Sequence, residues 1–340
     1  MDPQSARVTL ARLLVGQPSF PEDSSIDFKE GEEVASEQGV SIRRATYQSR
    51  PYLSYYLDPD GKNFSERFTQ TIPALLLTPK KQNGKAIVAL HQHAMEYDVG
   101  KSEPAGIPVV KSGTAQEHGP EIAGVQTCRS DPTQAYGLEL ALQGYRVLCF
   151  DFKPFEDRKY DHMYLQHTWG ERYASQEATL DGRSLMGDHV LDTMRAVDVL
   201  KSLGHEDIGV IGHSMGGMTA FYAMASDERI KTGAISCGVA TVDSVRKLPR
   251  VHTFAWAVPG LRREFGEIYS LFNLIAQRPM FISSGTNDVE FPIAGADEFV
   301  EKGRKYYADQ SGIRYNKFEG PHSFPDDARD KAYAFLKETV

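Results

Sequence analysis

One short segment of the chain places a serine where it could act as a nucleophile. Residues 212–217 read GHSMGG, so Ser214 has a glycine two positions before it and another two positions after it. The segment follows an apolar run at 208–211 and opens a helix-like stretch at 214–225. A G-x-S-x-G pattern between a strand and a helix is typical of a nucleophile elbow, in which a tight turn exposes the serine hydroxyl. We therefore predict that Ser214 is a nucleophile, although a glycine-rich turn with a helix-capping serine has the same pattern.

A serine hydroxyl becomes a good nucleophile only when a neighbouring base accepts its proton. Two histidines, His252 and His322, follow Ser214 in the chain. His322 comes soon after a predicted strand at 313–318, and a loop at the carboxyl end of the last strand can reach the elbow. His252 lies in a long irregular stretch that has no strand to position it. Since positioning decides which histidine can serve, we predict that His322 is the base.

A carboxylate between the serine and the histidine would complete a catalytic triad. The order serine, acid, histidine is the one that accompanies this type of elbow. Asp288 follows an apolar run at 280–283 through a turn at Gly285, whereas its competitor Glu290 lies two residues further from the strand end. The acid would hold the imidazole in the correct tautomer and stabilise its charged form. We predict that Asp288 has this role, and the structural alternative is a helix or turn cap.

The negative charge that develops on a carbonyl oxygen during attack needs hydrogen-bond donors, which form an oxyanion hole. We expect one donor to be the backbone N–H of Met215, directly after the nucleophile. The second should come from the loop after a predicted strand at 86–90, which begins with the residues HQH. We assign it to the N–H of His93, with the N–H of Gln92 as the alternative.

The same loop also raises the question of a metal. His91 and His93 are two positions apart and would share one face if the strand continued through them. A zinc site needs at least three protein ligands, and the sequence offers no convincing third one. His118, His162 and His167 are the loosely placed candidates. We therefore predict neither a metal nor a cofactor.

The elements that must position these residues alternate along the chain. Short apolar runs, typical of strands that are buried on both faces, are separated by helix-like stretches. This alternation predicts an α/β fold with a mostly parallel central sheet and helices on both of its faces. The apolar runs lie at 86–90, 146–150, 208–211, 232–236 and 280–283, a further strand is predicted at 313–318, and the helix-like stretches lie at about 132–143, 185–203, 214–225, 294–307 and 326–337.

Three regions depart from this alternation. Residues 1–70 combine an amphipathic start, an acidic stretch and a turn signal at 58–61, and we predict that they form an N-terminal extension packed on a catalytic domain of residues 71–340. Within that domain, residues 93–131 and about 240–278 are long excursions. Long insertions in a regular domain often carry function, so we expect the second to be a cap-like insertion.

Composition excludes several classes of partner. The 340 residues carry a formal net charge of −8, and no long block of lysine and arginine opposes it, which disfavours phosphate backbones and anionic lipids. Three cysteines are an odd and low count, typical of reduced thiols. The N-terminus lacks the basic and apolar regions of a signal peptide, and no apolar window is long enough to span a membrane. We predict a cytoplasmic protein with a small-molecule substrate, no nucleic-acid or membrane partner, and a capacity to form a homo-oligomer.

Together these segments resemble a known group of enzymes. From about residue 73 to the C-terminus, the chain resembles the dienelactone-hydrolase-like and acetyl-xylan-esterase-like branch of the α/β-hydrolase superfamily. The resemblance implies the α/β-hydrolase fold and a serine esterase or deacetylase that acts on small acyl esters, without identifying the alcohol. It rests on residues 91–93, 100–104, 182–187, 212–217, 277–279, 285–288, 291–292 and 320–325.

Other activities use the same kind of serine. Oligopeptidase-like serine peptidases share the elbow, but they carry a propeller domain whose blades need roughly 40 residues each, which is too much for the residues before the catalytic domain. A non-catalytic binding protein would not need all three triad residues, and a lyase or transferase stays open because fold does not determine function. We therefore expect a serine carboxylic ester hydrolase that works through an acyl-enzyme intermediate.

Overall fold

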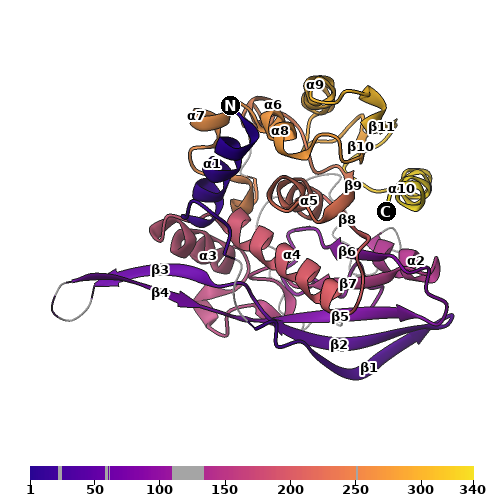
Figure 1. Cartoon of the computed structure of the whole chain (residues 1–340), viewed down its shortest axis with the longest axis horizontal. Helices are drawn as coiled ribbons and strands as arrows, with labels where there is room; N and C mark the ends of the chain where they lie inside the picture. Colours follow the sequence, from indigo (N-terminus) through magenta and orange to yellow (C-terminus); the bar gives the residue numbers. More distant parts are fainter. Residues whose placement is uncertain (22–24, 58–59, 61, 109–133, 250–251) are drawn as a thin grey trace.

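The computed structural model of the protein describes residues 1–21, 25–57, 60, 62–108, 134–249 and 252–340. These residues form a sheet of nine strands and a separate pair of strands (Figure 1). The strands are β1 (Lys29–Glu37), β2 (Val40–Gln48), β3 (Tyr52–Leu57), β4 (Asn63–Phe68), β5 (Thr71–Pro79), β6 (Ala86–Leu90), β7 (Arg146–Phe150), β8 (Ile208–His213), β9 (Ile230–Ser236), β10 (Met280–Gly285) and β11 (Ile313–Phe318).

The nine strands lie in the order β1-β2-β5-β7-β6-β8-β9-β10-β11. The six from β7 to β11 in this order run parallel, and β1, β2 and β5 are antiparallel to their neighbours. Every residue of β6 and β8 is buried, which explains why their sequences are continuous apolar runs. The predicted mostly parallel sheet is confirmed. Because β6 lies between β7 and β8, the strand order reverses there, and ligands bind beside such a point in open α/β sheets.

Helices cover both faces of this sheet, as the sequence predicts (Figure 1). One buried apolar cluster joins the sheet to α1, α4, α5 and α9, and a second joins the other face to α2 and α10. The main helices are α1 (Pro3–Val15), α2 (Tyr136–Leu142), α3 (Thr168–Leu180), α4 (Leu185–Ser202), α5 (Met215–Ser226), α9 (Ile293–Arg304) and α10 (Asp326–Thr339).

The segment of residues 1–70 contributes to the main sheet itself. Its strand β2 pairs with β5 along nine residues, from Val40 opposite Pro79 to Gln48 opposite Thr71. The acidic strand β1 lies at the edge of the sheet, and its residues are nearly all exposed. An exposed edge strand needs no apolar pattern, and charged residues on it discourage pairing with other chains. Strand β1 therefore lacks the apolar pattern that marks the other strands.

The long connections between strands gather helices and turns near one end of the sheet. Between β9 and β10 lie α6 (Val242–Arg246), α7 (Leu261–Phe265) and α8 (Phe272–Ile275), which form much of the predicted insertion at 240–278. The connection from β7 to α4 carries α3 and was not singled out from the sequence. Most of the other predicted excursion, residues 109–131, lies outside the described residues, as do three of the four residues of the predicted turn at 58–61.

Within the described ranges, no helix has both the length and the apolar character needed to cross a lipid bilayer.

Candidate active site

Ser214 lies at the turn from β8 to α5, in a strained backbone conformation. Its φ of 55° and ψ of −121° are uncommon for a residue with a side chain, and such strain often marks a functional position. The two flanking glycines make the turn sterically feasible. A β-carbon on Gly212 would lie 2.3 Å from the backbone of Gly216, and one on Gly216 would lie 2.1 Å from the carbonyl oxygen of Leu90. Helix α5 therefore begins directly against the end of β6.

The structure brings the side chains of Ser214, His322 and Asp288 together. The Nε2 atom of His322 lies 2.8 Å from the Oγ atom of Ser214, although the two residues are 108 positions apart in the chain. The Nδ1 atom of the same ring lies 2.9 Å from Oδ2 of Asp288. The three side chains thus form a continuous chain of hydrogen bonds from a carboxylate through an imidazole to a hydroxyl.

The loops after β10 and β11 place Asp288 and His322 beside each other. A β-carbon on Gly285 would lie 2.4 Å from the carbonyl oxygen of Pro321, so the two loops are in direct contact. The N–H of Asn287 donates to the carbonyl oxygen of Gly320 at 2.9 Å. The parallel register of β10 and β11 brings their carboxyl ends to the same edge of the sheet, where β8 also ends.

The competition between Asp288 and Glu290 for contact with His322 is decided by the loop geometry. Oδ1 of Asp288 accepts the backbone N–H groups of Glu290 at 2.7 Å and Phe291 at 2.9 Å, which leaves Oδ2 to face the imidazole. The carboxylate of Glu290 lies instead 3.9 Å from Nε2 of His252. Thus the imidazole within hydrogen-bond distance of the Oγ atom of Ser214 is that of His322.

Burial and local charge set the ionisation of the groups around His322. Burial alone would raise the pKa of Asp288, but the charge and hydrogen bond of His322, together with the two backbone N–H groups, lower it below its ordinary value. The ring of His213 lies 4.8 Å from that of His322. Burial, and secondarily His322, hold the pKa of His213 well below its ordinary value. His213 is therefore neutral at neutral pH and does not add a fixed positive charge beside His322.

The groups expected to form the oxyanion hole lie where the start of α5 meets the end of β6. In the portion of the chain that the structure describes, no protein group accepts a hydrogen bond from the N–H of Met215, Gln92 or His93. A β-carbon on Gly216 would also lie 2.6 Å from the carbonyl oxygen of His91, so the first turn of α5 touches this loop. The geometry is compatible with a donor from each side, and it leaves Gln92 open as the alternative to His93.

Sequence reasoning missed one buried carboxylate beside this loop. Glu171 lies in the first turn of α3, and its side chain is only 2% exposed. It accepts hydrogen bonds from Nε2 of His93 at 2.8 Å, the hydroxyl of Tyr97 at 2.8 Å, the hydroxyl of Thr253 at 2.5 Å and the N–H of Phe254 at 2.9 Å. No local signal in the sequence identifies it, because its partners come from two distant connections.

The charge of Glu171 is stabilised by those partners. Burial would raise its pKa, but the nearby His93 and the hydrogen bonds from His93, Thr253 and Tyr97 outweigh burial and lower the pKa to about 2. Glu171 is therefore ionised across the whole range in which the protein could work.

The nitrogen atoms of the two histidines considered as metal ligands have protein partners. Nε2 of His91 accepts the N–H of Phe152 at 3.0 Å, and its Nδ1 lies 2.7 Å from the carbonyl oxygen of Gln92. Burial lowers the pKa of His91 to about 3, so the ring is neutral. Nδ1 of His93 accepts the N–H of Met95 at 3.0 Å, while its Nε2 contacts Glu171. Both rings thus serve in hydrogen bonds within the protein.

Among the described residues, two groups of three side chains have the spacing of metal ligands, and neither contains His91, His93, His162 or His167. One group, Cys237 with Asp288 and His322, overlaps the site itself. The other, formed by Asp151, Glu156 and Asp157, surrounds the ammonium group of Lys101 at 2.6 to 2.8 Å. His118 lies outside the described residues.

Comparison with known proteins places this geometry in context. The model of the family described as alpha/beta hydrolase fold matches residues 130–269. The protein named "Putative hydrolase YtaP" from Bacillus subtilis (strain 168) is 30% identical over 247 residues, which cover 70% of this chain and 72% of that protein.

Two solved structures share the fold at low sequence identity. One, named "putative acetyl xylan esterase", from Bacteroides fragilis NCTC 9343, is 14% identical with a TM-score of 0.66, and the match covers 94% of this chain and 76% of that one. The other, a glucuronoyl esterase from Solibacter usitatus, is 15% identical with a TM-score of 0.60, and the match covers 98% and 91% of the two chains.

Proposed function

The chain belongs to the α/β-hydrolase fold family, and we propose that it is a serine hydrolase that cleaves a carboxylic ester of a small acyl group. The observation that carries the proposal is the unbroken hydrogen-bond chain from Asp288 through His322 to the hydroxyl of Ser214, at 2.9 and 2.8 Å. A structural role for these residues does not need the serine to be strained, nor to lie at the carboxyl edge of the sheet, where such folds bind ligands.

The first half of the proposed reaction forms an acyl-enzyme. Nε2 of His322 accepts the proton of Ser214 while Oγ attacks the ester carbonyl carbon. The oxygen of the tetrahedral intermediate receives hydrogen bonds from the N–H groups of Met215 and His93, which have no competing protein acceptor among the described residues. The imidazolium then gives its proton to the leaving alcohol as the C–O bond breaks, and Asp288 stabilises the charged ring.

The second half releases the acid. Water takes the place of the alcohol, and His322 accepts one of its protons as the oxygen attacks the acyl carbon. Collapse of the second tetrahedral intermediate returns the proton to Oγ of Ser214 and frees the carboxylic acid. The neutral ring of His213 beside His322 suits both steps, because a fixed positive charge there would make His322 a weaker base.

Esters are favoured over other acyl substrates by the similar structures, since both of the proteins compared by fold are named as esterases. Because a shared fold does not transfer substrate identity, we propose the type of bond and no particular alcohol.

Hydrolysis of a p-nitrophenyl ester series from acetate to octanoate tests the proposal. We expect the protein to release p-nitrophenol, with a preference for short acyl chains, and Ser214→Ala to lower kcat by about 10⁴-fold or more. Ser202→Ala is the matched control, because Ser202 lies at the exposed end of α4 and should leave kcat unchanged. Equal thermal unfolding of the variants shows that the loss is chemical. Full activity in Ser214→Ala would contradict the assignment.

A further inference from the structure

We propose that Glu171 is a positioning residue for the oxyanion hole. It holds the loop of residues 91–97, here called the oxyanion loop, and the part of the predicted insertion at residues 252–257 in fixed positions around Ser214. The inference deepens the proposed function and rests on it, because the loop matters for catalysis only if its N–H groups stabilise an oxyanion.

The first step is the convergence of two distant segments on one carboxylate. Oε2 of Glu171 binds the oxyanion loop, because it lies 2.8 Å from both Nε2 of His93 and the hydroxyl of Tyr97. Oε1 binds the other segment, because it accepts hydrogen bonds from the hydroxyl of Thr253 and the N–H of Phe254. A carboxylate offers about four acceptor positions, and here four donors fill them. A buried charge satisfied in this way is held rigidly, since each lost hydrogen bond is costly.

The second step links Glu171 to the backbone of the oxyanion loop. Ala94 and Met95 have φ values of 47° and 54°, in the left-handed region that residues with a β-carbon adopt rarely. The N–H of Met95 donates to Nδ1 of His93 at 3.0 Å, so the imidazole ring supports this strained turn. Because Nδ1 is an acceptor, Nε2 carries the hydrogen that is donated to Glu171. The carboxylate therefore fixes the ring, and the ring fixes the backbone on which the N–H of His93 lies.

The third step links the same carboxylate to the other side of the oxyanion hole. The hydroxyl of Thr253 lies 4.0 Å from the sulfur atom of Met215, the residue directly after Ser214. The side chain of Met215 is buried, so the segment around Thr253 covers the first turn of α5. Glu171 thus ties the insertion to the start of α5 and, through its other oxygen, ties the oxyanion loop to the same place.

Glutamine is the informative replacement because it keeps the volume and removes the charge. Its NH₂ group would face one of the two donor pairs. The hydroxyls of Tyr97 and Thr253 can rotate to accept a hydrogen bond, but the N–H of Phe254 cannot, and His93 cannot change tautomer without turning a hydrogen toward the N–H of Met95. One N–H group is therefore left facing another in either orientation of the amide.

The same helix offers a matched control in Glu177. Its carboxylate accepts the hydroxyl of Tyr160 at 2.9 Å and the ammonium group of Lys153 at 3.3 Å, and its side chain is 41% exposed. Within the described residues it has no hydrogen bond to the oxyanion loop or to the insertion. Glu177→Gln therefore makes the same chemical change in α3 without touching the proposed positioning contacts.

Kinetics and hydrogen exchange on the full-length protein test the inference together. With p-nitrophenyl acetate, we expect Glu171→Gln to lower kcat by about 10- to 100-fold while KM changes by less than about threefold, and Glu177→Gln to change neither. In hydrogen–deuterium exchange, peptides that contain residues 91–97 and 252–257 should exchange faster in Glu171→Gln. The peptide that contains His322 should exchange as in the wild type.

A double-mutant cycle shows whether Glu171 acts through His93. If it does, Glu171→Gln should lower log kcat in the His93→Gln background by less than half of the amount by which it lowers log kcat in the wild type. Should Glu171→Gln fail to fold, Tyr97→Phe removes one donor and keeps the carboxylate, and it should speed exchange in 91–97 alone.

Two results would overturn the inference. One is unchanged exchange in both segments of Glu171→Gln, and the other is faster exchange with an unchanged kcat, which would make Glu171 merely structural. If the wild type cleaves no ester, the proposed function fails, and the exchange comparison still decides whether Glu171 holds the two segments.

Discussion

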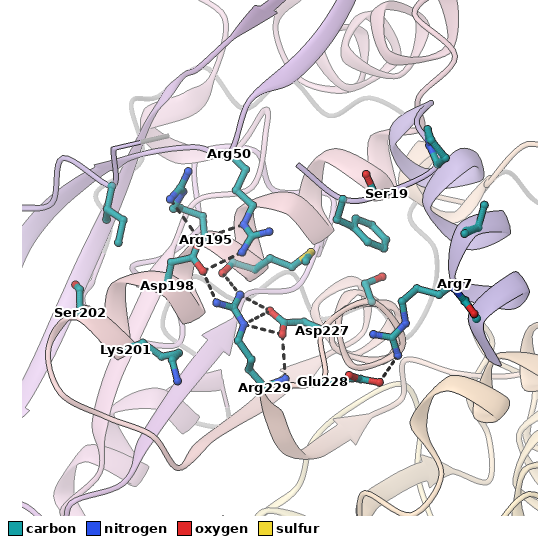
Figure 2. A pocket seen from close by; sticks show the side chains of 17 residues that line it. Arg7, Ser19, Arg50, Arg195, Asp198, Lys201, Ser202, Asp227, Glu228 and Arg229 are labelled. Carbon is teal, nitrogen blue, oxygen red and sulfur yellow. Dashed lines mark hydrogen bonds and ion pairs between the residues drawn. The ribbon is translucent and has the colours of Figure 1, made fainter. Parts of the chain in front are cut away.

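Two of the places where charged side chains are buried in this protein, around Asp198 and around Ser214, differ in how those side chains are paired. Asp198 pairs with Arg50 at 2.9 Å, Arg195 at 3.3 Å and Arg229 at 2.6 Å, and Arg229 also pairs with Asp227 (Figure 2). These residues line a cavity of about 970 Å³. In this cluster each guanidinium group binds one or two carboxylates and also donates to a backbone carbonyl oxygen.

The two clusters also lie at opposite edges of the sheet. Asp227 and Arg229 come just before β9, at the amino edge of the parallel strands, whereas Ser214 comes just after β8, at the carboxyl edge. Around Asp198 the pairs join the chain after β2 to α4 and to the start of β9. Around Ser214 the hydrogen bonds form a line that ends at a hydroxyl group. We infer that the cluster around Asp198 contributes to stability and that the cluster around Ser214 contributes to reactivity.

The largest expected effect comes from replacing one aspartate in each cluster by asparagine, in two separate variants. Asp288→Asn should lower kcat for p-nitrophenyl acetate by about 10⁴-fold, because the amide favours the wrong tautomer of His322. Asp198→Asn should leave kcat within about twofold of the wild type, since it does not contact the site. Steady-state kinetics of both variants, with circular dichroism as the control for folding, gives the comparison. Similar losses of kcat in the two variants would refute it.

The second test measures stability instead of activity. Asp198→Ala leaves three arginines without their shared acid, and removing one partner of a buried ion pair costs about 3–5 kcal/mol of unfolding free energy. Urea denaturation should show this loss. Asp243→Ala is the control, because its pairing with Lys247 is exposed and its removal should not be measurable. An unfolding free energy of Asp198→Ala equal to that of the wild type would contradict a stabilising role for Asp198.

The third test uses pH to examine the acid beside the oxyanion loop. The pKa of Glu171 is lowered from 4.5 to about 2, so the folded state binds its proton less readily than the unfolded state does. A lowered carboxyl pKa stabilises the fold above about pH 4.5, and this contribution disappears as pH falls towards 2.

Comparison of the wild type with Glu171→Gln checks this expectation. The difference in unfolding free energy between them should be constant from about pH 6 to 8 and should shrink below about pH 4.5. A difference that grows on acidification would mean that the carboxylate is not stabilised in its charged form.

The smallest expected effect concerns the thiol of Cys237, which lies near Ser214, and tests whether burial keeps this thiol unreactive. Cys237 follows β9 beside the site, and its thiol donates to the carbonyl oxygen of Ser323 at 3.4 Å. Burial, and secondarily the charge of Asp288, raises the pKa of the Cys237 thiol well above its ordinary value. We expect iodoacetamide at pH 8 to leave Cys237 unmodified in the native protein and to label it in urea, as read by peptide mass spectrometry. Rapid labelling of Cys237 in the native protein would show instead that its thiol is accessible to solvent.

Local pattern was sufficient for most of the fold. The buried strands β6 and β8 read as apolar runs because no residue in them meets water, and the elbow at Ser214 is recognisable because its two glycines are needed within five residues. The edge strand β1 escaped prediction because its residues are nearly all exposed. The connection that carries α3 was overlooked, since its helix has few buried residues and no motif.

By itself, then, the sequence determined the alternation of strands and helices, the tight turn at Ser214 and the chain order of serine, acid and histidine. Tertiary structure alone decided that Asp288 rather than Glu290 faces His322, that Glu171 joins two distant connections, and that three arginines share Asp198. The physical reason is that burial leaves a periodic pattern along a chain, whereas contacts between distant side chains depend on strand order and on the path of the loops, which have no local pattern.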